Sequence, residues 1–300
     1  METSSLSPGI LTDLPPDLDR KRADLLACLQ SLGNTAVAFS GGIDSTVVAK
    51  AAFLALGNEA VAITSDSPSV ARSEIDEAKL LAQKIGIRHL VVATSEFENP
   101  DYTKNDGTRC YYCKNELYAQ IEHVLPSLGI ATICSGANLD DLGDYRPGLV
   151  AAKEHNVRHP LQECGFTKKD VRALAKYWGL PTWDKPASPC LSSRLAPGVA
   201  VTSERTAKVE AAEGYLRKLG LRECRLRLHE GELARIEVPA GEIVRITTPE
   251  VREPLTRFLR DLGFKFVTLD LEGFRSGSLN ELVSLEVRRQ NLQTLQKNAP

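Results

Sequence analysis

The sequence has no surplus of charge of either sign: among 300 residues, 37 lysines and arginines face 39 acidic residues, a net charge of −2. A protein that binds nucleic acid mainly by electrostatic attraction would carry a clear excess of basic side chains. No segment approaches the run of about 18 apolar residues that crosses a membrane. The first twenty residues also lack the basic start and apolar stretch of a secretory signal. We therefore expect a cytoplasmic globular protein that binds neither nucleic acid nor membranes.

The cysteine content does not indicate a disulfide framework. Seven cysteines are an odd number, and a chain of this length buries a core without covalent cross-links. Reduced thiols, some with a chemical role, are therefore expected.

Apolar segments predict strands that alternate with helices over the first two thirds of the chain. Such alternation is typical of an α/β fold in which a parallel sheet has helices on both faces. The expected strands are 36–39, 60–64, 89–93 and 131–134, and the expected helices are 18–32, 45–56, 72–85, 114–125 and 168–178.

The pattern changes after Pro181, where a segment dense in proline and serine, 181–198, predicts an extended loop. Beyond it, helices at 203–219 and 249–262 and strands at 222–228, 233–238 and 265–269 predict a small α+β domain. The predicted organisation is a flexible arm (1–20), a first domain (21–198), the small α+β domain (199–277) and a polar tail (278–300).

The motif SGGIDS, residues 40–45, lies where the first strand turns into a helix. Glycines there allow close backbone approach, and exposed amides at a helix N-terminus bind anions. Ser40 and Ser45 add hydroxyl donors, and Asp44 is suited to hold a metal ion that neutralises phosphates. The motif has no Gly-Lys-Ser/Thr, so it is not a Walker A loop. We interpret it as a phosphate-binding loop.

A second polar cluster, SGANLDDLGDYRPG at 135–148, follows the last strand of the sheet. Ligands bind at the carboxyl ends of parallel strands, so Asp140, Asp141 and Asp144 are candidates to hold Mg²⁺ or to orient a nucleotide. The alternative for each is a carboxylate that only caps a solvated loop.

Cys110 and Cys113 form a Cys-x-x-Cys pair, and Cys190 lies far along the chain in the proline-rich segment. The spacing of the pair lets both thiolates face one metal ion or cluster. A structural zinc needs four ligands, and no cysteine or histidine follows at finger spacing. A redox disulfide stays open, and so does the identity of any metal. The other cysteines are expected to be buried and inert: Cys28, Cys134, Cys164 and Cys224.

SGGIDS resembles the motif of the PP-loop ATP pyrophosphatases, which cleave ATP between its α and β phosphates. Together with TRCYYCKNELY, SGANLDDLGDYRPG and PASPCLSSRLAPG, it resembles the LarE family over about residues 34–273. This resemblance implies an ATP- and Mg²⁺-dependent sulfurtransferase that adenylates pyridinium-3,5-biscarboxylic acid mononucleotide and then installs a thiocarboxylate. Lactate racemase-type enzymes use the resulting nickel-pincer cofactor. The implied ATP-binding residues are Ala38, Ser40, Gly41, Gly42, Asp44, Ser45, Thr64, Gly136 and Asp140.

Members of this family differ in their sulfur source. One branch holds a [4Fe-4S] cluster on three cysteines, with a free iron that carries an extra sulfide; the other sacrifices one cysteine of the Cys190 loop. Cys110, Cys113 and Cys190 favour the cluster branch, and the sacrificial branch stays open. Ser193 and Arg194, close to Cys190, are candidates to bind the substrate or the AMP phosphate.

Arg225 and Arg227 alternate on one predicted strand, so both face the same side. Such a pair suits bidentate phosphate recognition, and the family's counterparts bind the mononucleotide phosphate; the alternative is a solvated edge strand. Glu213 is assigned to the same pocket. The resemblance also implies a homo-oligomer whose product passes to a nickel-inserting enzyme.

Two rival functions stay open. The first is another PP-loop enzyme, either an amidating synthetase or a tRNA thiolase. The synthetase needs a glutaminase domain for which the chain has no room, and the thiolase must hold RNA. The second is a non-catalytic nucleotide-binding regulator, which would need neither the three thiols nor the acidic loop.

Overall fold

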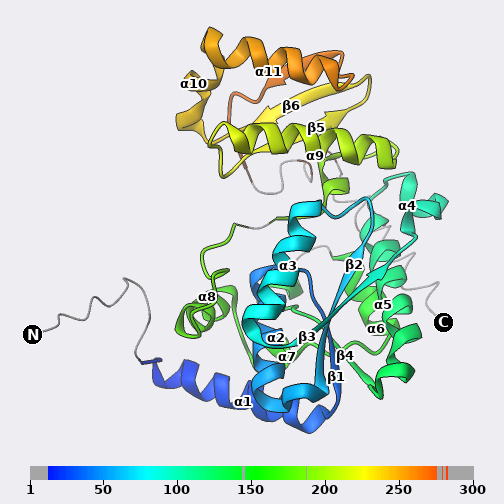
Figure 1. Cartoon of the computed structure of the whole chain (residues 1–300), viewed down its shortest axis with the longest axis vertical. Coiled ribbons are helices and arrows are strands. Elements are labelled where there is room, and N and C mark those ends of the chain that lie inside the picture. The colour runs from blue at the N-terminus through cyan, green and yellow to red at the C-terminus, as the bar shows by residue number, and fades with distance from the viewer. Residues whose placement is uncertain (1–12, 144–145, 187, 276–278, 280–281, 283–300) are drawn as a thin grey trace, which may run out of the picture. The chain divides into compact units, whose positions relative to one another are not determined.

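Figure 1 shows the computed structural model, which describes residues 13–143, 146–186, 188–275, 279 and 282. Residues 1–12 of the predicted arm and most of the predicted tail lie outside the described residues. The chain divides into two compact units. Unit 1 comprises the described residues up to 66 together with 72–94 and 115–188. Unit 2 comprises 67–71, 95–114 and the described residues from 189 onward.

Unit 1 is built on a parallel sheet in the order β3-β2-β1-β4. Its strands are β1 (Thr35–Ala38), β2 (Ala60–Asp66), β3 (Arg88–Ala93) and β4 (Thr132–Cys134). The first three residues of β1 and the first five of β2 are buried, as in strands covered on both faces. The sheet is flanked by helices, which confirms the predicted α/β class. These are α1 (Pro16–Leu32), α2 (Ile43–Leu56), α3 (Arg72–Ile85), α6 (Pro147–Glu154), α7 (Pro160–Glu163), α8 (Lys168–Tyr177) and most of α5 (Arg109–Leu128).

Two local features fix the helices that carry the site. α2 is apolar around most of its circumference and packs in the core of unit 1, so its N-terminus is held firmly. α8 begins with a capping box, in which the side chains of Thr167 and Asp170 each accept a hydrogen bond from the other's backbone amide. Lys168 follows Thr167, so the capping box places Lys168 at the first helical position.

In unit 1 the structure differs most from the sequence prediction at three helices. α5 begins at Arg109 rather than at 114, so the Cys-x-x-Cys pair lies in its first two turns. α6 and α7 were not predicted. Both have proline at the first helical position, Pro147 and Pro160, where the missing N–H costs nothing.

Unit 2 contains a smaller mixed sheet in the order β5-β6-β7. β5 (Arg225–His229) and β6 (Leu233–Glu237) are antiparallel, and β7 (Phe266–Leu269) runs parallel to β6. The helices of this unit are α4 (Pro100–Thr103), α9 (Ser203–Lys218), α10 (Ile243–Thr247) and α11 (Pro249–Asp261). Short 3-10 helices cover Gly57–Glu59, Glu96–Glu98, Leu139–Gly143, Leu191–Arg194 and Ala240–Glu242. Within the described part of the chain, no helix has the length and apolar character needed to cross a membrane.

Candidate active site

The SGGIDS loop of unit 1 is a tight turn that its own serines close. Gly41 has φ +68°, a left-handed conformation that glycine adopts without strain. The Ser40 hydroxyl accepts a hydrogen bond from the Gly42 amide (3.3 Å), and the Ser45 hydroxyl donates to the Gly42 carbonyl (3.1 Å). α2 starts at Ile43 with no side-chain cap, so its first amides are available to an anion.

The second predicted cluster closes onto this loop. A Cβ atom on Gly136 would lie 2.7 Å from the amide nitrogen of Ser45 and 2.9 Å from the carbonyl carbon of Asp44. Only glycine fits so close an approach, because both atoms belong to the backbone. β1 and β4 are neighbouring parallel strands, so their carboxyl ends bring the two loops together.

Asp44 is held between two side chains that come from distant parts of unit 1. Its Oδ1 accepts a hydrogen bond from the side-chain nitrogen Nδ2 of Asn138 (3.1 Å), and its Oδ2 forms an ion pair with Lys168 Nζ (2.5 Å). The backbone amide of Lys168 also donates to Asp140 Oδ2 (2.6 Å). Lys168 is not among the residues predicted from sequence, because 124 residues separate it from Asp44. Its ammonium lies beside the phosphate-binding loop, which has no Walker lysine of its own.

The predicted acidic residues of the second cluster are engaged within that cluster and with α8. Asp141 accepts from the Asn138 amide (2.9 Å) and pairs with Arg146 (2.8 Å). Asp141 therefore has the capping role that was left open as the alternative, and Asp140 anchors the start of α8. Asp144 lies outside the described residues. Among those described, no three acidic, histidine or cysteine side chains form a ready site for a metal ion.

Thr64 and Ala38, predicted to contact the nucleotide, lie at the ends of adjoining strands. The buried Thr64 hydroxyl donates to the Phe39 carbonyl (2.7 Å) and meets His89 Nε2 (2.8 Å). Because that hydroxyl is already committed, any contact of Thr64 with adenine involves its backbone or methyl group.

The three candidate cysteine ligands all belong to unit 2. Cys110 is exposed and Cys113 half-buried; they stand one turn apart at the start of α5, on one face of the helix. Burial raises the pKa of the Cys113 thiol, and the nearby Cys190 and Cys110 thiols raise it further. Cys190 influences Cys113 although 77 residues separate them along the chain.

The resemblance assigns these three thiols to a [4Fe-4S] cluster, whose thiolate ligands bind different irons. The remaining cysteines divide into two groups: Cys134 and Cys224 are buried, whereas Cys28 and Cys164 are only half-buried.

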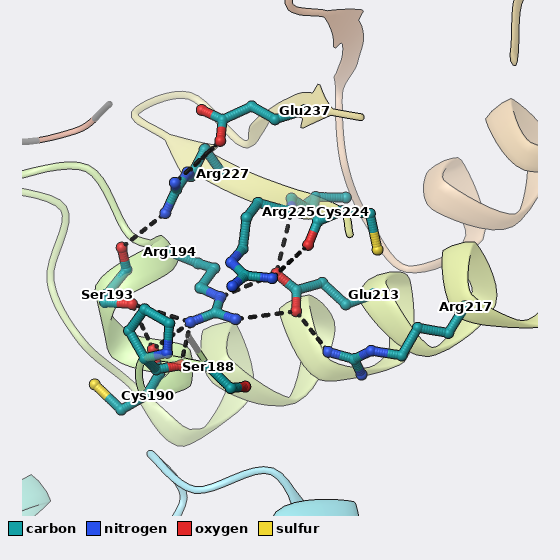
Figure 2. Close-up of polar contacts among 12 residues, drawn as sticks. Ser188, Cys190, Ser193, Arg194, Glu213, Arg217, Cys224, Arg225, Arg227 and Glu237 are labelled. Atoms are coloured by element: carbon teal, nitrogen blue, oxygen red, sulfur yellow. Dashed lines mark hydrogen bonds and ion pairs between the residues drawn. The ribbon is translucent and has the colours of Figure 1, made fainter. Parts of the chain in front are cut away.

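A buried ion pair adjoins the Cys190 loop (Figure 2). Arg194 Nε lies 3.0 Å from Glu213 Oε1, and Arg194 Nη2 lies 3.3 Å from Glu213 Oε2. Neither side chain is more than 1% exposed. Glu213 also pairs with Arg217 (3.0 Å) and accepts from the Leu226 amide (3.2 Å). Glu213 thus acts as the buried counter-ion of Arg194.

Arg194 also holds the turn that carries Cys190. Its Nη1 donates to the carbonyl of Cys190 (3.0 Å), to that of Pro189, and to Ser193 Oγ (3.1 Å), contacts that Figure 2 shows. The Ser193 hydroxyl donates to the Cys190 carbonyl as well (2.6 Å). Arg194 and Ser193, predicted to contact substrate, therefore also shape the thiol loop.

Arg225 and Arg227 are buried, so the alternative of a solvated edge strand is wrong, although β5 is at the edge of its sheet. Arg227 pairs with Glu237 (3.0 Å) and donates to the Ser193 carbonyl (3.3 Å). Burial lowers the pKa of Arg225, and repulsion from Arg194 and Arg227 lowers it further. Arg194 and Arg227 each pair with a buried carboxylate, Glu213 and Glu237, which balances much of their charge. The planar guanidinium groups of Arg225 and Arg227 are of the kind that binds phosphate.

Comparisons with known proteins agree with this geometry. The NAD synthase family model matches residues 28–104, which include the phosphate-binding loop. The tRNA-specific 2-thiouridylase MnmA of Wolbachia pipientis is 28% identical over 190 residues, about half of each chain. An uncharacterized protein of Synechocystis, slr1717, is 45% identical over 89% of this chain and 99% of its own length.

These matches and the site define the class: an ATP-using PP-loop enzyme that transfers sulfur. The pyridinium-3,5-bisthiocarboxylic acid mononucleotide synthase of Lactiplantibacillus plantarum is 40% identical over 269 residues, 89% of this chain and 96% of the relative. The chain belongs to the family of that synthase, the LarE family.

Proposed function

We propose that the protein activates a carboxylate of pyridinium-3,5-biscarboxylic acid mononucleotide with ATP and replaces one of its oxygens by sulfur. In the first step a carboxylate oxygen attacks the α-phosphorus of ATP, and the bond to the β-phosphate breaks. The products are the acyl adenylate and pyrophosphate. In the second step hydrosulfide attacks the acyl carbon, AMP leaves with the bridging oxygen, and one proton is released. No electrons are gained or lost by the acid.

Unit 1 supplies the activation chemistry in this proposal. The backbone amides at Gly41 and Gly42 and the hydroxyls of Ser40 and Ser45 bind the leaving pyrophosphate. Lys168 and a Mg²⁺ ion held by Asp44 neutralise its growing charge, which is the main requirement of phosphoryl-type transfer. The remaining predicted nucleotide contacts are Ala38, Thr64, Gly136 and Asp140.

Unit 2 recognises the substrate. Arg225 and Arg227 bind the phosphate of the mononucleotide, and Arg194, whose charge Glu213 balances, holds the adjoining Cys190 turn. Glu213 fixes the orientation of Arg194 by accepting two of its hydrogen bonds. Ser193 offers a hydroxyl at the same place.

Cys110, Cys113 and Cys190 hold a [4Fe-4S] cluster in this proposal. When bound, the cluster supplies the sulfide that ends in the thiocarboxylate. The alternative is a sacrificial Cys190, which gives up its own sulfur and becomes dehydroalanine. The seven free thiols suit a reducing compartment, so we place the protein in the cytoplasm as a homo-oligomer whose product goes to a nickel-inserting enzyme and then to a racemase.

One observation carries the proposal. The buried arginine group and the thiol loop are one hydrogen-bonded structure, because Arg194 donates to the carbonyl of Cys190. Amidation and simple nucleotide binding require neither part. A tRNA thiolase would need a surface that attracts RNA, and the chain has a net charge of −2.

The test is a reaction of anaerobically purified protein with ATP, Mg²⁺ and the biscarboxylic acid mononucleotide. We expect equal amounts of pyrophosphate and AMP, and a product whose mass has gained sulfur in place of oxygen. Iron analysis and intact-protein mass spectrometry separate the sulfur donors, since loss of one H₂S from the chain per turnover identifies the sacrificial route. Pyrophosphate release that depends on bulk tRNA instead of the mononucleotide would refute the proposal.

A further inference from the structure

Asn105 has an unusual backbone conformation beside the thiol-bearing helix. It lies between α4 and α5 in unit 2, has φ +57° and is only 2% exposed. Positive φ costs free energy for any residue with a Cβ, although less for asparagine than for most. Asn156 has a similar φ of +52° in unit 1 and so provides a matched comparison.

The Asn105 side chain binds the segment that follows the Cys190 loop. Its amide nitrogen lies 2.9 Å from the carbonyl oxygen of Ala196 and 2.8 Å from that of Val199. The Asn105 carbonyl in turn accepts from the Gly198 amide (3.0 Å). Both the backbone and the side chain of Asn105 therefore hold one turn of a segment about 90 residues away in sequence.

Arg109 extends these contacts to the thiol loop itself. Its Nη1 donates to Asn105 Oδ1 (2.5 Å) and to the carbonyl of Ser192 (2.7 Å). Ser192 lies two residues after Cys190, and Arg109 directly precedes Cys110. A continuous hydrogen-bonded chain thus runs from one thiol-bearing segment to the other.

The side chain of Asn105 is engaged at both ends, because its nitrogen donates to two carbonyls and its oxygen accepts from Arg109. A buried, fully used asparagine side chain is costly to remove, since each orphaned partner loses its hydrogen bond.

We propose that Asn105 is a positioning residue, which together with Arg109 fixes the spacing between Cys190 and the Cys110–Cys113 pair. The adenylation step does not require this clasp, by which we mean the hydrogen bonds of Asn105 and Arg109 to the segment 192–199. The inference rests on the proposed function only in its purpose, which is to keep three sulfurs at the spacing that a cluster needs. The spacing itself is measurable in the metal-free chain.

The experiment bridges thiols in the full, metal-free, reduced chain with dibromobimane, a small reagent that links two nearby thiols. Peptide mapping identifies the bridges, and the rate of single alkylation by iodoacetamide corrects for thiol reactivity. We expect Cys190 in the wild type to bridge to Cys110 or Cys113. In both Asn105→Ala and Asn105→Gly the corrected rate falls about tenfold.

The two variants separate side-chain positioning from backbone strain. Glycine tolerates positive φ, so Asn105→Gly removes only the hydrogen bonds. Asn156→Ala, which carries the same backbone cost in unit 1, should bridge at the wild-type rate. If Asn105→Ala does not fold, Asn105→Gly and Arg109→Lys, which keeps the charge but not the two-fold contact, still decide the matter.

Wild-type bridging by Asn105→Gly would overturn the clasp, as would a wild type in which Cys190 bridges to neither partner. Failure of the proposed function looks different: the clasp variants lose bridging as expected, but anaerobic wild-type protein contains no iron and makes no thiocarboxylate.

Discussion

Lys168 Nζ lies 2.5 Å from Asp44 Oδ2, which joins the first residue of α8 to the phosphate-binding loop of unit 1. Both side chains are partly exposed, 38% and 25% respectively, so solvent and ligands can reach the pair. A pair of this kind contributes little to stability, because water screens it. We therefore infer that the Lys168–Asp44 pair serves ligand binding and not stability.

Replacing Lys168 by Met should lower the rate of pyrophosphate release about a hundredfold, the usual effect of removing one transition-state charge partner. Lys169→Met is the matched control, since Lys169 is the exposed neighbour of Lys168 on the same helix. Pyrophosphate release is measured under saturating ATP, and thermal unfolding checks the fold. Equal rates for the two variants would exclude Lys168 from the activation step.

Gly136→Ala should abolish ATP binding with a modest loss of stability. The new methyl group would meet the Ser45 amide nitrogen at 2.7 Å, so the loop that binds phosphate must shift. Overpacking of this kind costs about 2 kcal/mol. Gly214→Ala is the control, because a Cβ there meets nothing within 4 Å and alanine favours a helix interior. Isothermal titration with ATP compares them, and tight binding by Gly136→Ala would contradict the proposed contact.

Glu213→Ala should destabilise unit 2 by about 4 kcal/mol, because it leaves the buried Arg194 charge without its partner. Glu213→Gln keeps the shape but not the charge, so it should be less damaging. Urea unfolding followed by far-ultraviolet circular dichroism measures the free energy of unfolding of both variants. In the variant that still folds, we expect a raised KM for the mononucleotide and an unchanged KM for ATP. A raised KM for ATP alone would place Glu213 elsewhere in the mechanism.

Acid should destabilise unit 1 through His89. Burial lowers the pKa of His89, and Lys79 lowers it further, from an ordinary value of 6.5. The unfolded chain therefore binds the proton at higher pH than the folded chain does, so stability falls as the pH drops below about 6.5. The loss is complete only below the folded pKa. His159 and His229 have pKa shifts of the same sign.

His89→Gln should reduce this dependence, because glutamine can still donate to Thr64 but does not titrate. The free energy of unfolding is compared between about pH 7.5 and 5.5, a range that spans histidine titration and lies above that of carboxylates. Parallel pH profiles for the variant and wild type would show that His89 plays no part.

Cys113→Ala should remove the iron and the visible absorbance from anaerobically purified protein. Cys224→Ala is the matched control, since Cys224 is a buried thiol of the same unit outside the proposed ligand set. Iron content and absorbance spectra decide between them. Full iron content in Cys113→Ala would end the proposed ligand role.

The parts that sequence predicted well depend on local signals. The strand–helix alternation and the SGGIDS turn could be predicted because their signals, the period of apolar residues and the placement of glycines, span only a few residues. α5 begins earlier than predicted, at Arg109, and the residue before it, Thr108, is of a type that caps helices. α6 and α7 begin at Pro147 and Pro160 and were not predicted.

The missing parts of the site are long-range partners. Lys168 meets Asp44 across 124 residues, and Asn105 meets Val199 across 94. Neither residue type is informative alone, because lysine and asparagine are common on surfaces. The alternation of Arg225 and Arg227 predicted that both face one side of a strand, but only the packed structure shows that they are buried.

The hydrogen bond from the Leu226 amide to Glu213 has a practical consequence. The amide proton of Leu226 belongs to β5, and its environment depends on the charge of Glu213, the ion-pair partner of Arg194. Its chemical shift and its exchange with solvent therefore report on the charge in the proposed substrate pocket, and both can be followed as the mononucleotide is titrated in.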